Sequence, residues 1–153
     1  MQTDARMFDV RNLTKALDEQ LAVTAHPRQR AMLKNLRRHA LLEVSGRWRE
    51  ILVPEMVVDH PVYRISEKSG SFVLNGMEEV AAFYDSLSSA GLMVFGPIEE
   101  RVAVADWGIA LESLFGHFVP GHTLAAQGED IDDPDAWYHL THTYASFWPY
   151  DDD

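Results

Sequence analysis

The sequence contains no cysteine, so it can form neither a disulfide bond nor a thiolate nucleophile. It also has no apolar run approaching the about 20 residues that a membrane-spanning helix requires. The amino terminus, MQTDARMFDV, lacks the basic start and the apolar centre of a secretory signal. From these absences we expect a cytoplasmic protein that does not associate with a membrane.

Positive charge is scarce and unevenly placed. The chain has 13 Lys and Arg against 24 Asp and Glu, a formal net charge of -11, and no Lys or Arg follows Arg101. Because nucleic-acid binding needs clustered cations, we expect no nucleic-acid partner. The one basic segment, residues 26–39, could be a small RNA-binding face or a solvated face that pairs with the acidic C-terminal half or a partner subunit. The overall charge favours the solvated face.

The rest of the composition is that of an ordinary globular protein. Apolar residues make up 46% and charged residues 24% of 153 residues, which suits one domain over residues 1–153. Such a chain can bury roughly 68–70% of the surface that its unfolded form exposes, enough for a core with an internal cavity.

Helical spacing of apolar residues dominates the first third of the chain. It predicts a helix over residues 9–25, a second helix from Pro27 to about Val44, and a short third helix within RWREIL, residues 47–52. A further helix is predicted over residues 77–91, with Gly91 at its C-terminal end.

The period then changes to that of β-strands. MVVDHPVYRI, residues 56–65, is predicted as a strand, and residues 72–76 as a short extended segment. Two strands over residues 96–105 and 108–119 are joined by a hairpin-like turn, Pro120 and Gly121 predict a turn, and residues 137–148 form a last strand after an acidic loop. This order predicts an α+β fold, a curved, cone-shaped antiparallel sheet packed on N-terminal helices around an apolar pocket.

Two motifs carry a resemblance to a known family. DHPVY at residues 59–63 and LNGMEEVAAFY at residues 74–84, in this order of elements, resemble the nuclear transport factor 2-like superfamily, in particular its SnoaL-like and ketosteroid isomerase-like branch. The matching positions of the second motif are Gly76, Glu78 or Glu79, Val80, Phe83 and Tyr84. The resemblance implies a SnoaL-like core over residues 27–153, an N-terminal helical extension over residues 1–26, and a homodimer.

The resemblance also implies where an active site would lie. His60 occupies the position of the isomerase general base, and His39 that of the oxyanion-hole tyrosine. The second oxyanion position falls near Ser146, with His142 and Tyr144 as neighbours on the same face. Since all three positions depart from the isomerase set towards histidine and tyrosine, the site is more similar to that of dehydratase and cyclase relatives.

The residues themselves leave alternatives open at the strand. In a regular strand His60 and Asp59 point to opposite faces, so only one faces the pocket unless a bulge intervenes. His60 can serve as a general acid or base, or it can be a hydrogen-bonded histidine at the strand's end without chemistry. If Asp59 faces inward instead, it is the catalytic group.

A second candidate pair lies on the helix. His39 and Glu43 are at positions i and i+4, so they share one helical face. This spacing suits a carboxylate that orients an imidazole, and it equally suits an ordinary exposed pair. Aromatic residues are expected mainly in the core, and those expected to contact a ligand, together with His142, are Trp48, Tyr63, Tyr84 and Tyr144.

No motif indicates a metal or a cofactor. The sequence contains no HxH, HExxH or cysteine pair, and its acidic loop lacks the glycine and closing glutamate of an EF-hand. The leading hypothesis, which the family resemblance implies, is a SnoaL-like isomerase, dehydratase or polyketide-cyclase type enzyme that performs cofactor-free acid–base proton transfer on a lipophilic carbonyl compound. The alternative is a non-catalytic ligand-binding or dimerisation module of the same fold.

Overall fold

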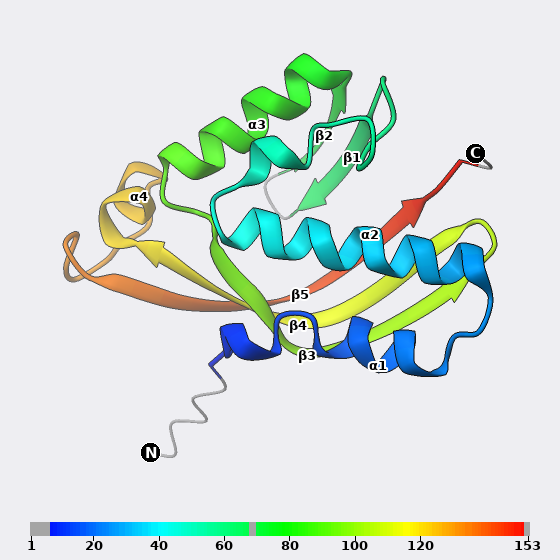
Figure 1. Cartoon of the computed structure of the whole chain (residues 1–153). Coiled ribbons are helices and arrows are strands. Elements are labelled where there is room, and N and C mark those ends of the chain that lie inside the picture. Colours follow the sequence, from blue (N-terminus) through cyan, green and yellow to red (C-terminus); the bar gives the residue numbers. More distant parts are fainter. Residues whose placement is uncertain (1–6, 68–69, 152–153) are drawn as a thin grey trace.

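A computed structural model gives the structure of residues 7–67 and 70–151, which form an α+β fold (Figure 1). Helices come first, a β-hairpin and a helix follow, and a curved antiparallel sheet completes the fold. The elements in chain order are η1 (Val10–Asn12), α1 (Lys15–Val23), α2 (Pro27–Val44), η2 (Trp48–Glu50), β1 (Val62–Glu67), β2 (Gly70–Asn75), α3 (Met77–Ser89), β3 (Val94–Ala105), β4 (Gly108–Pro120), α4 (Gly121–Ala126) and β5 (Trp137–Pro149).

The N-terminal helices follow the sequence prediction closely, with one break. Residues 9–25 were expected to form one helix, but the structure has the 3-10 turn η1 followed by α1. The Asp9 side chain accepts a hydrogen bond from the Arg11 backbone N–H, and this cap belongs to η1 alone. Helix α2 begins at Pro27 and ends at Val44 as predicted, and the predicted third helix is the 3-10 turn η2.

The strand predicted to begin at Met56 was wrong, because β1 begins only at Val62. The backbone N–H groups of Met56 and Val57 both donate to the carbonyl of Val53, so this stretch continues the preceding turn. Pro61 has no N–H for a strand partner, and its carbonyl accepts from Gly76 instead. Strand β1 pairs with β2 in a separate two-stranded antiparallel sheet.

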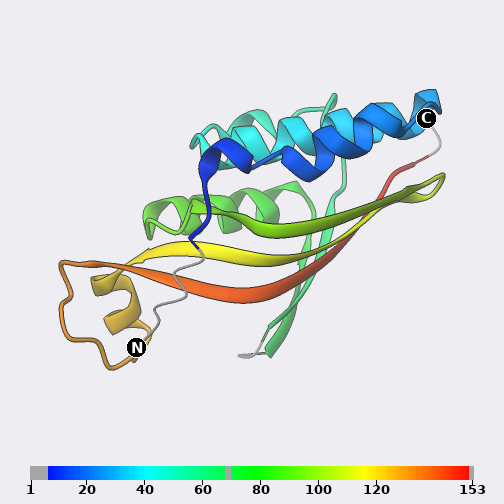
Figure 2. The same cartoon turned by 90° about the horizontal axis from the view of Figure 1, so that it is seen from below.

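The larger sheet has the strand order β3-β4-β5, and every pair is antiparallel. The sequence predicted all three strands, to within two residues at each end. Its register shifts once, between Pro97 and Glu99 of β3. Figure 2 shows helices α1 and α2 over one face of this curved sheet. We call this face, which carries Ile109 and Leu111, the inner face, and the opposite one the outer face.

Helices α3 and α4 follow the ends of strands β2 and β4. Helix α3 follows Gly76, whose φ of 99° is a left-handed conformation that glycine tolerates best. Helix α4 was not predicted, since Pro120 and Gly121 indicated only a turn. Pro120 is instead the N-cap of α4, and the Thr123 hydroxyl ties the helix to the carbonyl of Ala90.

The core has two parts on either side of α2. One part lies between α1, α2 and the inner face, and its fully buried members are Leu33 and Ile109. The other part lies between α2, η2 and α3, and its fully buried members are Ile51 and Val80. Helix α2 is therefore enclosed on both flanks. No helix within the described residues is long and apolar enough to cross a membrane.

Candidate functional site

The candidate site is built around His39, which lies inside the fold on helix α2. Its position continues the helix's buried stripe, whose other members are Met32, Leu33, Leu36 and Leu42. Only 5% of the His39 surface is exposed. The indole of Trp148 from β5 meets the imidazole edge-on, with ring centroids 4.8 Å apart. An imidazole in this position cannot rely on water, so its hydrogen bonds must come from the protein.

Two side chains meet the same nitrogen of His39. The Nε2 atom lies 3.1 Å from the Tyr84 hydroxyl and 3.5 Å from Oε2 of Glu43, one turn further along α2. When His39 is neutral with Nε2 unprotonated, this atom accepts a hydrogen bond from the Tyr84 hydroxyl. When Nε2 carries a proton, the nearby Glu43 carboxylate can stabilise the imidazolium. The arrangement therefore accommodates both protonation states of the imidazole.

Tyr84 is held by aromatic packing. It lies on α3, is 3% exposed, stacks on Trp48 with ring centroids 5.7 Å apart, and meets Tyr63 edge-on at 6.4 Å. Burial, and then the negative charge of Glu43, raise the pKa of Tyr84 far above its usual range. The phenol therefore keeps its proton and acts as a hydrogen-bond donor. We refer to His39, Glu43, Tyr63 and Tyr84 as the His39 cluster.

Burial shifts the pKa values of Tyr63 and of a tyrosine outside the cluster, Tyr144, in the same direction. Burial raises the pKa of Tyr63, partly offset by a hydrogen bond with Tyr84, and the Glu43 charge raises it further. Burial also raises the pKa of Tyr144 on β5, and Glu43 and Glu100 add to this rise. Tyr144 is 37% exposed, so it reaches solvent while still responding to the Glu43 charge.

His60 and Asp59 lie at the surface instead of in the expected pocket. Both are exposed, and the Nε2 atom of His60 lies 3.0 Å from Oδ1 of Asn75 at the end of β2. The imidazole also packs against Gly76, where an added Cβ would lie 3.2 Å from the ring. The expected alternation of inward and outward side chains does not apply, because neither residue belongs to a strand.

The structure thus joins most of the predicted site residues and separates the rest. His39, Glu43, Tyr63, Tyr84 and Trp48 come together from α2, β1, α3 and η2. The Tyr144 side chain lies on the inner face, as does His142, which is exposed and has its ring centroid 5.5 Å from that of Phe115.

Two inner-face residues were missed by the sequence reasoning. Burial raises the pKa of Glu100 on β3 to about 7. Ser113 on β4 is 2% exposed, and its hydroxyl has no hydrogen-bond partner within the described residues. Each is a polar residue in a series of inward-facing apolar residues. Glu100 stands in the series of Val102 and Val104 on β3, and Ser113 in the series of Leu111 on β4. This interruption is the signal that could have identified them.

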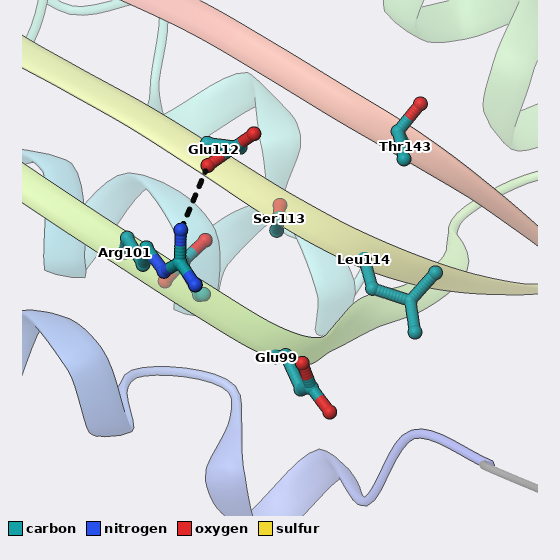
Figure 3. A pocket seen from close by; sticks show the side chains of 7 residues that line it. Glu99, Arg101, Glu112, Ser113, Leu114 and Thr143 are labelled. Carbon is teal, nitrogen blue, oxygen red and sulfur yellow. Dashed lines mark ion pairs between the residues drawn. The ribbon is translucent and has the colours of Figure 1, made fainter.

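A hollow lies on the outer face of the sheet. It has a volume of about 240 Å³, and the residues that line it are Glu99, Glu100, Arg101, Glu112, Ser113, Leu114 and Thr143. Figure 3 shows that Arg101 and Glu112 lie on the near side of their strands, where Nη1 and Oε2 are 3.6 Å apart, whereas Ser113 lies behind β4. The alternation along the strands accounts for this separation.

Comparisons with protein-family models, with curated proteins and with solved structures gave no match to this chain. Among the described residues, no group of three or more His, Asp or Glu side chains is arranged to hold a metal ion. The argument for function therefore rests on the geometry of the His39 cluster and its neighbours.

Proposed function

We propose that the protein is a SnoaL-like small-molecule enzyme that moves a proton on a lipophilic carbonyl compound without a cofactor. The reaction would be an isomerisation, a dehydration or a cyclisation. One observation carries the proposal: a buried imidazole, His39, shares its Nε2 atom between a protonated phenol, Tyr84, and a carboxylate, Glu43. Buried groups with strongly shifted pKa values, such as Tyr84, are concentrated at functional sites.

The roles follow from the protonation states. Neutral His39 would accept at Nε2 a proton from the carbon next to the substrate carbonyl, as the Tyr84 hydroxyl turns from this nitrogen to the substrate oxygen. Such general base catalysis is worth about 10²–10⁴-fold. Glu43 would stabilise the resulting imidazolium. Tyr84 and Tyr63, whose raised pKa values keep them protonated, would donate hydrogen bonds to the oxygen on which negative charge develops.

The surroundings favour a lipophilic substrate. Trp48 stacks on Tyr84, and the ring centroids of Tyr144 and Phe115 lie 5.4 Å apart. Flat apolar surfaces therefore border the polar groups. In this proposal the sheet and helices form the nuclear transport factor 2-like cone, and its apolar interior receives the substrate. We further propose a cytoplasmic homodimer, which the exposed apolar side chains Trp137 and Phe147 on β5 support.

The second candidate is a non-catalytic ligand-binding or dimerisation module of the same fold. A specific observation favours it: the chain's own aromatic side chains, Trp148 and Tyr84, pack directly against His39. The imidazole already has a hydrogen-bond partner in Tyr84. In this case the His39 cluster would serve stability, and replacing His39 would lower stability without changing any chemistry.

Ligand binding is the first test of the enzyme proposal. Thermal unfolding would be followed with a steroid ketone, 2-tetralone and 2-naphthol, each added to the wild type, His39→Gln, Glu43→Gln and the control His60→Ala. A ligand at 100 times its dissociation constant adds about 2.7 kcal/mol of stability. We expect at least one ligand to stabilise the wild type and His60→Ala equally, with a smaller shift for both cluster variants. If no ligand stabilises the wild type, the non-catalytic module becomes the better account.

A further inference from the structure

A row of three polar side chains crosses the middle of the inner face. Glu100 of β3 is the register partner of Ser113 of β4, which is in turn the partner of Tyr144 of β5. Directly paired residues in antiparallel strands point to the same face, with Cβ atoms about 4.5–5.5 Å apart. The neighbouring rows are apolar on β3 and β4, where Leu111 pairs with Val102 and Phe115 with Pro97, and they end on β5 at Ser146 and His142.

Ser113 is the residue that the fold alone does not explain. It is 2% exposed, and its hydroxyl has no hydrogen-bond partner in the described part of the chain. Nearly all buried polar side chains in native proteins bind a partner, since an unsatisfied one destabilises the fold. A buried, unpartnered serine between Leu111 and Phe115 on β4 therefore indicates a group that binds there.

Its two neighbours define the chemistry of that group. Burial raises the pKa of Glu100 to about 7, so the carboxyl holds its proton up to neutral pH. Tyr144 also keeps its proton, because burial raises its pKa; a hydrogen bond with Ser146 offsets part of this rise, and the charge of Glu43 adds to it. The row thus presents three O–H groups. A bound anion would face the carboxylate of Glu43 as well, so an uncharged oxygen fits better than a carboxylate.

We propose that Glu100, Ser113 and Tyr144 form a subsite that binds an uncharged oxygen, a hydroxyl or a ketone, on the lipophilic substrate. This inference rests on the proposed function, because Tyr144 lies close enough to Glu43 to feel its charge and so connects the row with the His39 cluster. The substrate would then carry two oxygen functions, one at the His39 cluster and one at the row.

A hydroxyl deletion with a matched control tests the subsite. Ser113→Ala removes the inner-face hydroxyl, and Thr143→Ala removes one from the outer face, one residue from Tyr144 along β5 (Figure 3). The probes are naphthalene, 2-naphthol and 2-naphthoate, which share one apolar body and differ in the oxygen group. Dissociation constants would be measured by calorimetry, and the unliganded melting temperatures by thermal unfolding.

For Ser113→Ala we expect a dissociation constant for 2-naphthol about tenfold higher, with that for naphthalene unchanged. The melting temperature without ligand should rise, because an unsatisfied hydroxyl is removed. Thr143→Ala should leave both dissociation constants unchanged, and 2-naphthoate should bind the wild type more weakly than 2-naphthol. Failure of 2-naphthol to bind, or an equal effect of Ser113→Ala on naphthalene and 2-naphthol, would overturn the subsite.

The subsite and the proposed function can fail separately. Selective loss of 2-naphthol binding in Ser113→Ala, without any proton exchange of a bound ketone, would keep the subsite and remove the enzyme. Proton exchange that depends on His39, together with 2-naphthol binding that ignores Ser113, would keep the enzyme and remove the subsite.

Discussion

Replacing Tyr84 by phenylalanine removes the hydroxyl at the centre of the His39 cluster, and with it the hydrogen bonds to His39 and Tyr63. The ring keeps its stack on Trp48 at 5.7 Å and its edge contact with Tyr63, so the packing is unchanged. The change removes the hydroxyl that lies 3.1 Å from Nε2 of His39. Since His39 is only 5% exposed, water cannot easily replace the lost partner.

The expected loss follows from leaving a buried nitrogen without its partner. Such a change costs about 1–3 kcal/mol of the free energy of unfolding. For a domain of this size each kcal/mol lowers the melting temperature by roughly 2–4 °C. Urea unfolding followed by tryptophan fluorescence gives the free energy directly, and the m-value should stay unchanged because the same surface is exposed on unfolding.

Tyr138→Phe supplies the control. The Tyr138 hydroxyl also makes hydrogen bonds, to the backbone of Asp133, but these lie in an exposed turn. Its loss should cost no more than about 0.5 kcal/mol, as for other surface changes. If Tyr84→Phe is as mild as Tyr138→Phe, the Tyr84–His39 hydrogen bond does not hold the cluster together, and the reasoning fails.

Three further changes test other parts of the account. Gly76→Ala should lower the free energy of unfolding by at least about 1 kcal/mol more than Gly46→Ala. Both glycines have positive φ, but only at Gly76 would an added Cβ meet another side chain, the His60 ring. Equal losses in urea unfolding would contradict this. His60→Ala should leave proton exchange of a bound ketone unchanged, and a lost rate in NMR would return His60 to the active site. Burial raises the pKa of Glu100 from 4.5 to about 7, so the folded state retains a proton that the unfolded chain has released, and stability should fall as pH rises through this interval. The free energy of unfolding of Glu100→Gln should therefore exceed that of the wild type at pH 8, by on the order of 1 kcal/mol after allowance for partial exposure. Urea unfolding at pH 5 should show a smaller difference in this free energy, and a difference independent of pH would refute the assignment.

Regular periodicity made most of the fold predictable. The stripe on α2 and the alternation in β3, β4 and β5 each extend over many residues, so the pattern outweighs local exceptions. Helix α4 has only six residues, and within so short a stretch Pro120 and Gly121 indicate a turn as well as they indicate a helix start. The sequence therefore determined long elements better than short ones.

The segment before β1 was mispredicted for a physical reason. Met56, Val57 and Val58 are apolar, and the two valines are β-branched like many strand residues, yet Met56 and Val57 donate their N–H groups back to the Val53 carbonyl. That choice depends on how η2 and the following turn pack, which propensities do not describe. The error moved the expected catalytic residues, His60 and Asp59, from the surface to a pocket.

The candidate site was predictable only within single elements. The i, i+4 spacing placed His39 beside Glu43 correctly, because helix geometry fixes that contact. The partner from α3, Tyr84, required knowledge of how α3 packs on α2. Glu100 and Ser113 could have been found from the strand alternation alone, as polar residues in inward positions, but their pairing required the sheet register.

Exchange of the protons next to a ketone tests the central claim most directly. The protein would be incubated with 2-tetralone in D₂O, and loss of the proton signal followed by NMR for the wild type, His39→Gln and the buffer alone. The account predicts faster exchange with the wild type than in buffer, and a loss of about 10²–10⁴-fold of that acceleration in His39→Gln. Exchange no faster than in buffer, or an undiminished rate in His39→Gln, would contradict the claim that His39 is a general base.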